Sequence, residues 1–206
     1  MSETHASQTD ESELAALLTR REIRRGGDLD PRGRGFDARP LVAASVLVLL
    51  ERGPGWRVVL TKRTTSVDHH KGEVSFAGGM RDPADTDPRA TALREAHEEL
   101  GLDPALVTVL GEIDELVTVT GFVVTPVVAT VDPDHVFRPN PGEVERVLRV
   151  PLEHLRDANS WFEDVRTWRG RTYVLRSCRF GDDIIWGATS RMLQNFLEII
   201  PAHLLL

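Results

Sequence analysis

The feature of this sequence that most constrains its fold is a succession of short apolar runs that are separated mostly by turns. Two pairs of runs flank the turn sequences Arg-Gly-Pro-Gly at 52–55 and Arg-Gly at 169–170, so each pair is predicted to form a β-hairpin. The predicted strands are 41–50, 56–60, 72–76, 107–113, 122–131, 144–150, 161–168 and 172–180, and the predicted helices are 11–23, 89–100 and 188–200. Because strands outnumber helices and regular crossover helices are lacking, we predict an α+β fold with a mixed sheet and helices on its outside.

Composition excludes several classes of protein. The 206 residues carry a formal charge of −7, from 25 Lys and Arg against 32 Asp and Glu. Proteins that coat nucleic acid are basic, so we expect no nucleic-acid partner. No run of about 18 apolar residues occurs, so no membrane-spanning helix is expected. The polar, acidic residues 1–10 differ from a secretory signal. One cysteine, Cys178, excludes an internal disulfide, and we therefore expect a cytoplasmic location.

The chain is expected to have three parts. These are an N-terminal arm with a short helix at 1–40, one domain at 41–200, and a tail at 201–206. Between residues 20 and 39 the arm holds seven arginines and four acids. Such an arm either reaches a polyanionic substrate or a partner subunit, or is only a solvated segment. Both interpretations stay open, as does the oligomeric state, for which a homodimer is one alternative.

The segment 89–100 carries the strongest local signals for a helix. Asp87 can cap its first turn, Pro88 suits the first helical position, and Gly101 can end it in a left-handed conformation. At 100° per residue, one stripe of small and apolar side chains falls within about 100° and is expected to pack on the sheet. That stripe consists of Ala92, Leu93, Ala96 and Leu100.

Three glutamates, Glu95, Glu98 and Glu99, occupy the neighbouring face of this helix. Between residues 82 and 99 there are six acids and two bases, which holds more than half of the net charge. Like charges three and four residues apart repel one another, and only Arg94, four residues before Glu98, can hold one carboxylate. A solvated face is the simple interpretation, but the cluster is favourable with a cation. Magnesium, or manganese, is the expected ion because hard cations bind several carboxylate oxygens.

The sequence REAHEELGL at 94–102 resembles the second half of the Nudix box, a motif of hydrolases that cleave nucleoside diphosphates linked to another moiety. The first half begins at Gly79, and Asp85 stands where the family usually has Glu. The count from Gly79 to Arg94 is one residue longer than in the standard box. The resemblance implies the Nudix fold, an α/β/α sandwich with a mixed central sheet and a loop-helix-loop catalytic motif.

The segments LTKR at 60–63 and GEVSFAGG at 72–79 are similar to the signature of the coenzyme A pyrophosphatase branch of that family. The extra residue in the box is also typical of this branch. Two departures are Ala77, where Pro is common, and Asp68-His69, where Arg is often found. The segments 140–144, 150–152 and 185–189 also look like this branch, so the resemblance covers about 41–197.

The resemblance implies a magnesium- or manganese-dependent enzyme. It would cleave coenzyme A, or an acyl or oxidised form, to 3′,5′-ADP and 4′-phosphopantetheine. The implied metal ligands are Glu95, Glu98 and Glu99, and the implied catalytic residues are Glu98, Glu99, Arg94 and Glu143. The general base is a box glutamate or an acid of a later loop, for which Glu143 is the best candidate and Glu112, Asp114 and Glu115 are alternatives. The expected substrate-binding residues are Arg63, His70, Lys71, Gly72, Phe76, Gly78 and Gly79.

Two other functions remain open from the sequence. The first is a Nudix hydrolase of another small nucleotide-derived substrate, such as ADP-ribose, a dinucleoside polyphosphate or an oxidised nucleotide. The second is a non-catalytic nucleotide sensor. Sensors of this kind usually lack acids of the box, whereas this chain retains Glu95, Glu98 and Glu99.

Overall fold

The computed structural model of the chain describes residues 3–27, 40–52, 55–64, 72–133, 135–168 and 170–205. The helices are α1 (Glu3–Thr19), α2 (Pro88–Leu100), α3 (Leu152–Arg156) and α4 (Gly187–Ile199), with short 3-10 turns at Pro104–Leu106, Ala158–Ser160 and Ala202–Leu205. The strands are β1 (Arg25–Gly27), β2 (Val42–Arg52), β3 (Trp56–Arg63), β4 (Val74–Ser75), β5 (Ala77–Met80), β6 (Thr108–Glu112), β7 (Glu115–Val117), β8 (Phe122–Val131), β9 (Val144–Pro151), β10 (Trp161–Trp168), β11 (Arg171–Phe180) and β12 (Asp183–Ile185).

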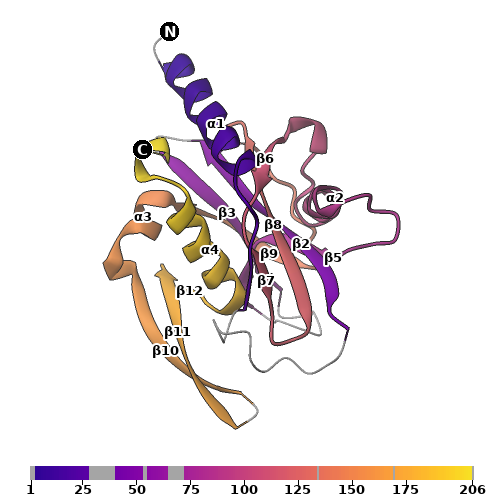
Figure 1. The fold of residues 1–206 in the computed structure, drawn as a ribbon, viewed down its shortest axis with the longest axis vertical. Helices are drawn as coiled ribbons and strands as arrows, with labels where there is room; N and C mark the ends of the chain where they lie inside the picture. Colours follow the sequence, from indigo (N-terminus) through magenta and orange to yellow (C-terminus); the bar gives the residue numbers. More distant parts are fainter. Residues whose placement is uncertain are drawn as a thin grey trace.

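The strands from β1 to β9 form one mixed sheet (Figure 1). At its centre β2 and β8 are parallel, in a register that runs from Val42 opposite Phe122 to Glu51 opposite Val131. Strands β3 and β5 pair antiparallel with β2, β6 and β7 pair antiparallel with β8, and β9 pairs antiparallel with β3. Strands β10, β11 and β12 form a separate antiparallel sheet, whose β10–β11 hairpin extends from the body. The predicted mixed sheet is therefore confirmed.

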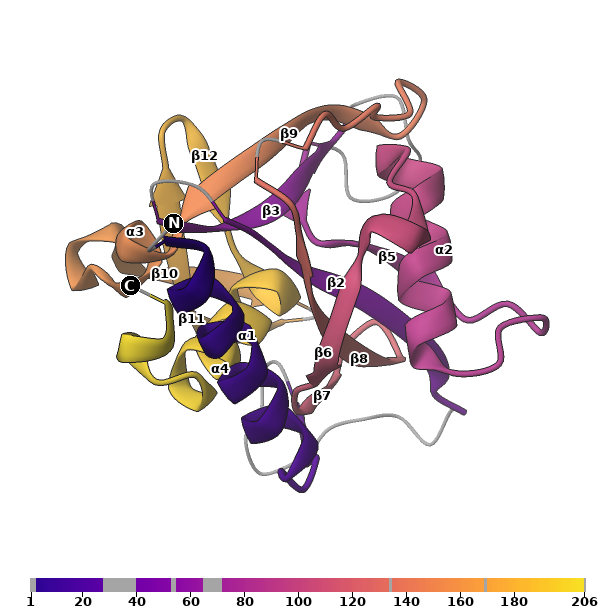
Figure 2. The same cartoon turned by 90° about the horizontal axis from the view of Figure 1, so that it is seen from above.

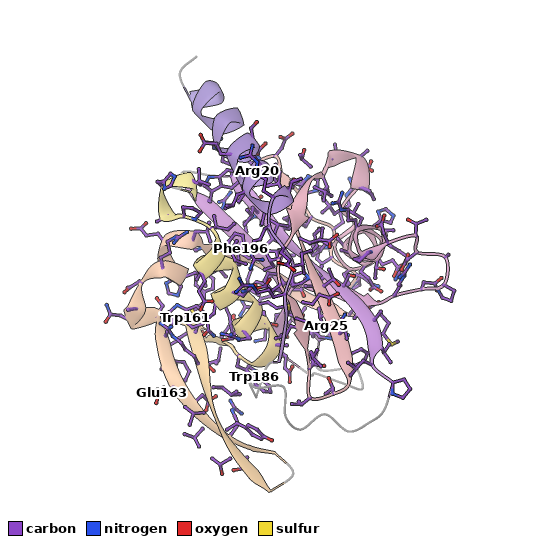
Figure 3. The ribbon with its side chains drawn as sticks, viewed as in Figure 1. Arg20, Arg25, Trp161, Glu163, Trp186 and Phe196 are labelled. Carbon is purple, nitrogen blue, oxygen red and sulfur yellow. The ribbon has the colours of Figure 1, made fainter. Side chains whose placement is uncertain are left out.

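Helices cover both faces of the large sheet, as Figure 2 shows, with α2 on one side and α1 and α4 on the other. Successive side chains of a strand point to opposite faces, so β2 contributes to two cores. Leu47 and Leu49 pack with the small residues of α2. Val48 and Leu50 belong to the core that also holds Phe196, which projects from α4 (Figure 3). The expected α/β/α sandwich is thus the observed architecture.

The N-terminal segment contributes to this core. Helix α1 begins and ends earlier than the predicted 11–23. Its Leu14 is fully buried, and Leu18 lies so close to Gly111 of β6 that a Cβ there would come within 2.7 Å of the Leu18 Cβ. The Arg21 guanidinium then pairs with both carboxylate oxygens of Asp114 at 2.8 Å. The stretch from Leu14 to Gly27 therefore packs against the sheet, and residues 28–39 of the expected arm lie outside the described residues.

Both predicted hairpins are present as β2–β3 and β10–β11. The sequence did not predict the short elements β1, β7, β12 and α3. The strand expected at 72–76 is present only as β4 at 74–75, and β5 follows at 77–80, outside the predicted range. None of the helices in the described ranges is long and apolar enough to cross a membrane.

Replacing Leu14 with Ala should lower the free energy of unfolding by about 2 to 4 kcal/mol, because a fully buried leucine leaves a cavity. The matched control is Leu106→Ala, at a leucine that is 53% exposed, which should cost less than about 0.5 kcal/mol. Urea unfolding followed by circular dichroism measures both. Equal costs for the two variants would contradict the packing of α1 into the core.

Candidate active site

Helix α2 carries the acidic face, and its ends are fixed as predicted. The Asp87 carboxylate accepts a hydrogen bond from the Ala90 N–H at 2.9 Å, and Pro88 is the first helical residue. Gly101 has φ of 62°, and its N–H donates to the His97 carbonyl at 2.9 Å. These caps set where the helix begins and ends, and so they set which side chains face the sheet.

The glycine at position 79 lets this helix approach the sheet closely. Gly78 and Gly79 lie inside β5, where Gly79 is opposite Ser45 of β2. A Cβ on Gly79 would lie 2.5 to 2.7 Å from the carboxylate atoms of Glu95. The Glu95 carboxylate therefore rests on the backbone of β5, in space that any other residue would fill.

Arg94 connects the acidic groups. Its Nε and Nη2 donate to the two oxygens of Asp85, each at 3.1 Å, and Nη2 also donates to the Met80 carbonyl at 3.0 Å. Its Nη1 lies 2.9 Å from Glu95 Oε1 and 3.2 Å from Glu98 Oε2. One guanidinium thereby joins the loop before α2, the end of β5 and two glutamates of the helix. Bidentate geometry of this kind fixes direction as well as charge.

The Asp85–Arg94 pair keeps both groups ionised. Hydrogen bonds from Arg94 lower the pKa of Asp85 to about 2, and bonding to Asp85 raises the pKa of Arg94. Asp85 is buried and was not among the site residues proposed from the sequence. The signal that points to it is its place in the box, where the family usually has Glu, although its side chain is one carbon shorter.

Two of the helix glutamates are held in unfavourable surroundings. Glu99 is 2% exposed, and burial raises its pKa to about 8 against the opposing effect of Arg63. The Arg63 Nη1 lies 3.5 Å from Glu99 Oε1, while Glu99 Oε2 is buried without a hydrogen-bond partner. Burial also raises the pKa of Glu95, although Arg94 acts in the opposite direction. A carboxylate that is removed from water and has an oxygen without a hydrogen-bond partner is stabilised in its ionised form by a nearby cation.

The third glutamate stands apart from these two. Glu98 has a side chain that is 52% exposed and is held by Arg94. In the segments that the structure describes, no group of three carboxylate, histidine or cysteine side chains is arranged to hold a metal ion. Glu95 and Glu99 face the sheet, so they form the inner part of the acidic cluster and Glu98 its outer rim.

A later loop brings Glu143 to the same place. Its backbone N–H donates to the Asn140 carbonyl at 3.0 Å, and its carbonyl accepts from the Thr64 N–H at 2.9 Å. The Asn140 N–H in turn donates to the Glu99 carbonyl at 2.9 Å. Repulsion by the Glu143 charge contributes to the raised pKa values of both Glu95 and Glu99. The fold therefore brings together an acid that is 44 residues from Glu99 in the sequence.

The remaining residues proposed from the sequence lie in different surroundings. Phe76 is 2% exposed and packs in the core beneath α1 and α4. Gly72, with φ of 69°, lies in the turn before β4. His70 and Lys71 are outside the described residues. The alternative bases are each paired with an arginine, Glu112 with Arg89, Asp114 with Arg21, and Glu115 with Arg25.

Comparison with known proteins identifies the family of the domain that contains this helix. The model of the NUDIX domain family matches residues 39–169. The chain belongs to the Nudix family. A Nudix hydrolase of Arabidopsis thaliana, named Nudix hydrolase 15, mitochondrial, is 40% identical over 163 residues, which are 75% of this chain and 57% of that protein. The chain thus spans little more than half the length of this relative.

Two further likenesses concern the Nudix domain. The peroxisomal coenzyme A diphosphatase NUDT7 of Mus musculus is 38% identical over 155 residues, covering 72% of this chain and 66% of that protein. The crystal structure of DR0079 from Deinococcus radiodurans matches with a TM-score of 0.50 at 16% identity, covering 78% of this chain and 87% of that one. At this identity the structural likeness bears on the fold alone.

The stability of the metal-free Nudix domain should fall as pH rises, because of Glu99. Its pKa is raised from 4.5 to about 8, so the folded state holds the proton more tightly than the unfolded state does. The resulting stabilisation is complete below about pH 4.5 and is lost as pH rises through about 8. The Glu99→Gln variant has no titrating group at this position, so its stability lacks this dependence on pH.

In EDTA, the stability of Glu99→Gln relative to the wild type should therefore increase by up to about 1.4 kcal/mol per pH unit between pH 5 and 7. Urea unfolding of both proteins at pH 5, 6 and 7 measures the difference. A difference that stays constant over this range would show that burial does not perturb Glu99.

Gly79→Ala should weaken Mn²⁺ binding by about tenfold or more, because the new methyl group displaces the Glu95 carboxylate. The control is Gly55→Ala, since a Cβ at Gly55 meets nothing within 4 Å. Titration of Mn²⁺ followed by electron paramagnetic resonance gives both affinities. Equal affinities in the two variants would mean that Glu95 does not bind the ion.

Proposed function

We propose that this protein is a metal-dependent Nudix hydrolase that cleaves the diphosphate of coenzyme A, or of its acyl or oxidised forms, to 3′,5′-ADP and 4′-phosphopantetheine. The observation that carries the proposal is the cluster of Glu95, Glu99 and Glu143 around a glycine strand. The cluster combines the buried Glu99 carboxylate, one oxygen of which has no hydrogen-bond partner, with the half-buried Glu95 carboxylate, which rests on the backbone of Gly79. This arrangement suits a reaction in which positioning and electrostatics dominate.

The carboxylate oxygens of the site are donors of the type that magnesium and manganese bind, and two glutamates rather than three form its inner part. The Glu99 Oε2 atom lacks a hydrogen-bond partner, and both Glu95 and Glu99 are ionised with difficulty unless a cation is near. We assign Glu95 and Glu99 as principal ligands and Glu98, on the exposed rim, as a further ligand or a holder of bound water. When bound, such an ion neutralises the diphosphate and lowers the pKa of water.

The side chains of the chain have separate parts in the proposed reaction. Glu143 accepts the proton of the water whose oxygen attacks phosphorus, and the bridging oxygen leaves with the electron pair of the broken bond. Arg63, close to Glu99 and one-quarter exposed, can turn towards a phosphate oxygen. Arg94 keeps Glu95 and Glu98 in place through its bonds to Asp85.

Coenzyme A is favoured as the substrate by two likenesses of the sequence. One is the resemblance of segments 60–63 and 72–79 to the coenzyme A pyrophosphatase signature. The other is the 38% identity to the mouse coenzyme A diphosphatase. The intact box acids argue against a non-catalytic sensor. A cytoplasmic location belongs to the same proposal, since the lone Cys178 is a fully buried thiol and needs no oxidising compartment.

With coenzyme A and Mg²⁺, the wild-type protein should release 3′,5′-ADP and 4′-phosphopantetheine in equal amounts, as identified by mass spectrometry. Glu98→Gln should lower turnover by about a hundredfold, because it removes one charge from the ion site. Glu153→Gln, at an exposed glutamate of α3, is the control and should keep full turnover. Faster cleavage of ADP-ribose, a dinucleoside polyphosphate or an oxidised nucleotide than of coenzyme A would refute the substrate but retain the hydrolase.

A further inference from the structure

A turn with the sequence Asn-Pro-Gly-Glu at 140–143 precedes β9. Its residue types suit the conformation of the turn. Pro141 fixes its own φ at the second position of the turn, and the Asn140 carbonyl accepts the N–H groups of Glu143 at 3.0 Å and Val144 at 2.8 Å. The Asn140 Oδ1 accepts from the Gly142 N–H at 3.0 Å. This side-chain bond is the Asx turn for which asparagine and aspartate are favoured.

Asn140 also links two parts of the site. Its backbone N–H donates to the Glu99 carbonyl at 2.9 Å, which ties the turn to the last residues of α2. Its side-chain Nδ2 donates to the Glu143 carboxylate oxygen Oε1 at 3.2 Å. One residue thus contacts the backbone of a proposed metal ligand and the side chain of the proposed base.

The orientation of the Asn140 amide follows from its partners. The Gly142 N–H can only donate, and an ionised carboxylate can only accept. The amide must therefore present its oxygen to Gly142 and its nitrogen to Glu143, since the opposite orientation would set like groups against each other. Aspartate would satisfy Gly142 equally well but would repel Glu143.

We propose that Asn140 is a positioning residue that aims the Glu143 carboxylate towards Glu95 and Glu99. This inference rests on the proposed function, in which Glu143 accepts the proton of water. The Thr64 N–H fixes the backbone carbonyl of Glu143, but only a bond to the carboxylate can fix the direction of its flexible side chain. A displacement of about 1 Å in such a group costs up to about a hundredfold in rate.

The alternative is that Asn140 only forms the turn and does not position Glu143. The Asn140→Asp variant distinguishes these two roles. Aspartate keeps the acceptor for the Gly142 N–H, so the turn persists, but it removes the donor to Glu143. Asn140→Ser is the second variant, because a serine hydroxyl also accepts in such turns and adds no charge. The matched control is Asn159→Asp, where another asparagine Nδ2 donates to a carboxylate, that of Asp157, at 2.9 Å in an exposed turn.

Steady-state kinetics with Mg²⁺ and coenzyme A should show that Asn140→Asp lowers kcat by about tenfold to a hundredfold. Its KM should stay within about threefold, and its midpoint of urea unfolding and its Mn²⁺ affinity should match those of the wild type. Asn140→Ser should change kcat in the same direction, and Asn159→Asp should change nothing. A kcat within about twofold of the wild type for Asn140→Asp would overturn the proposal.

A double-mutant cycle with Glu143→Gln tests whether Asn140 acts through Glu143. In the double variant the amide introduced at position 143 can donate to the carboxylate introduced at position 140, which restores the bond with reversed polarity. Asn140→Asp should therefore cause no further loss of kcat in the Glu143→Gln background. Losses that multiply would show that Asn140 acts elsewhere, which also overturns the proposal.

The wild-type control distinguishes this inference from the proposed function. If the wild type leaves coenzyme A intact but cleaves ADP-ribose or another diphosphate, the same variants are compared on that substrate, and only the choice of coenzyme A fails. If the wild type cleaves no diphosphate, both proposals fail.

Discussion

The Arg94 guanidinium is the interaction on which the rest of the site depends. Three glutamates on one face of a helix repel each other, and such a face would ordinarily remain in water. Here one cation reaches Asp85, Glu95, Glu98 and the Met80 carbonyl together. The helix, the preceding loop and the end of β5 are consequently held in one arrangement, and the acidic face can lie against the sheet.

Close packing then determines the electrostatics of the cluster. The residues of α2 that face the sheet include Ala92 and Ala96, and the strand beneath them has glycine at 78 and 79. With such small residues the Glu95 and Glu99 carboxylates come close to the backbone and lose water, which raises their pKa values. The same packing that stabilises the sandwich thereby destabilises two charges within it. A bound cation would offset the unfavourable free energy of these two charges, so cation binding and folding stability would be linked.

Local signals account for what the sequence could predict, and tertiary contacts for what it could not. The bounds of α2 follow from Asp87, Pro88 and Gly101, which act within one turn of the helix. Strand β1 is Arg-Gly-Gly, with no apolar pattern, and it forms because β7 offers it an edge. Asp85 and Asn140 were not proposed as site residues for the same reason. Asn140 meets Glu99, which lies 41 residues earlier in the chain, so only the fold shows that contact. Asp85 is nine residues from Arg94, but no local pattern in the sequence shows that the Arg94 guanidinium turns back to bind its carboxylate.

The negative charge of the chain takes on a specific meaning in this arrangement. Around the glycine strand the structure gathers five acidic side chains, Asp85, Glu95, Glu98, Glu99 and Glu143, and two arginines, Arg63 and Arg94. The arginines compensate only part of that charge, so a polyanion alone would be repelled. In the proposed reaction, a diphosphate that arrives with a divalent ion would reverse the sign of the interaction. The acidic composition, which argues against a nucleic-acid coat, is therefore compatible with the proposed small phosphorylated substrate.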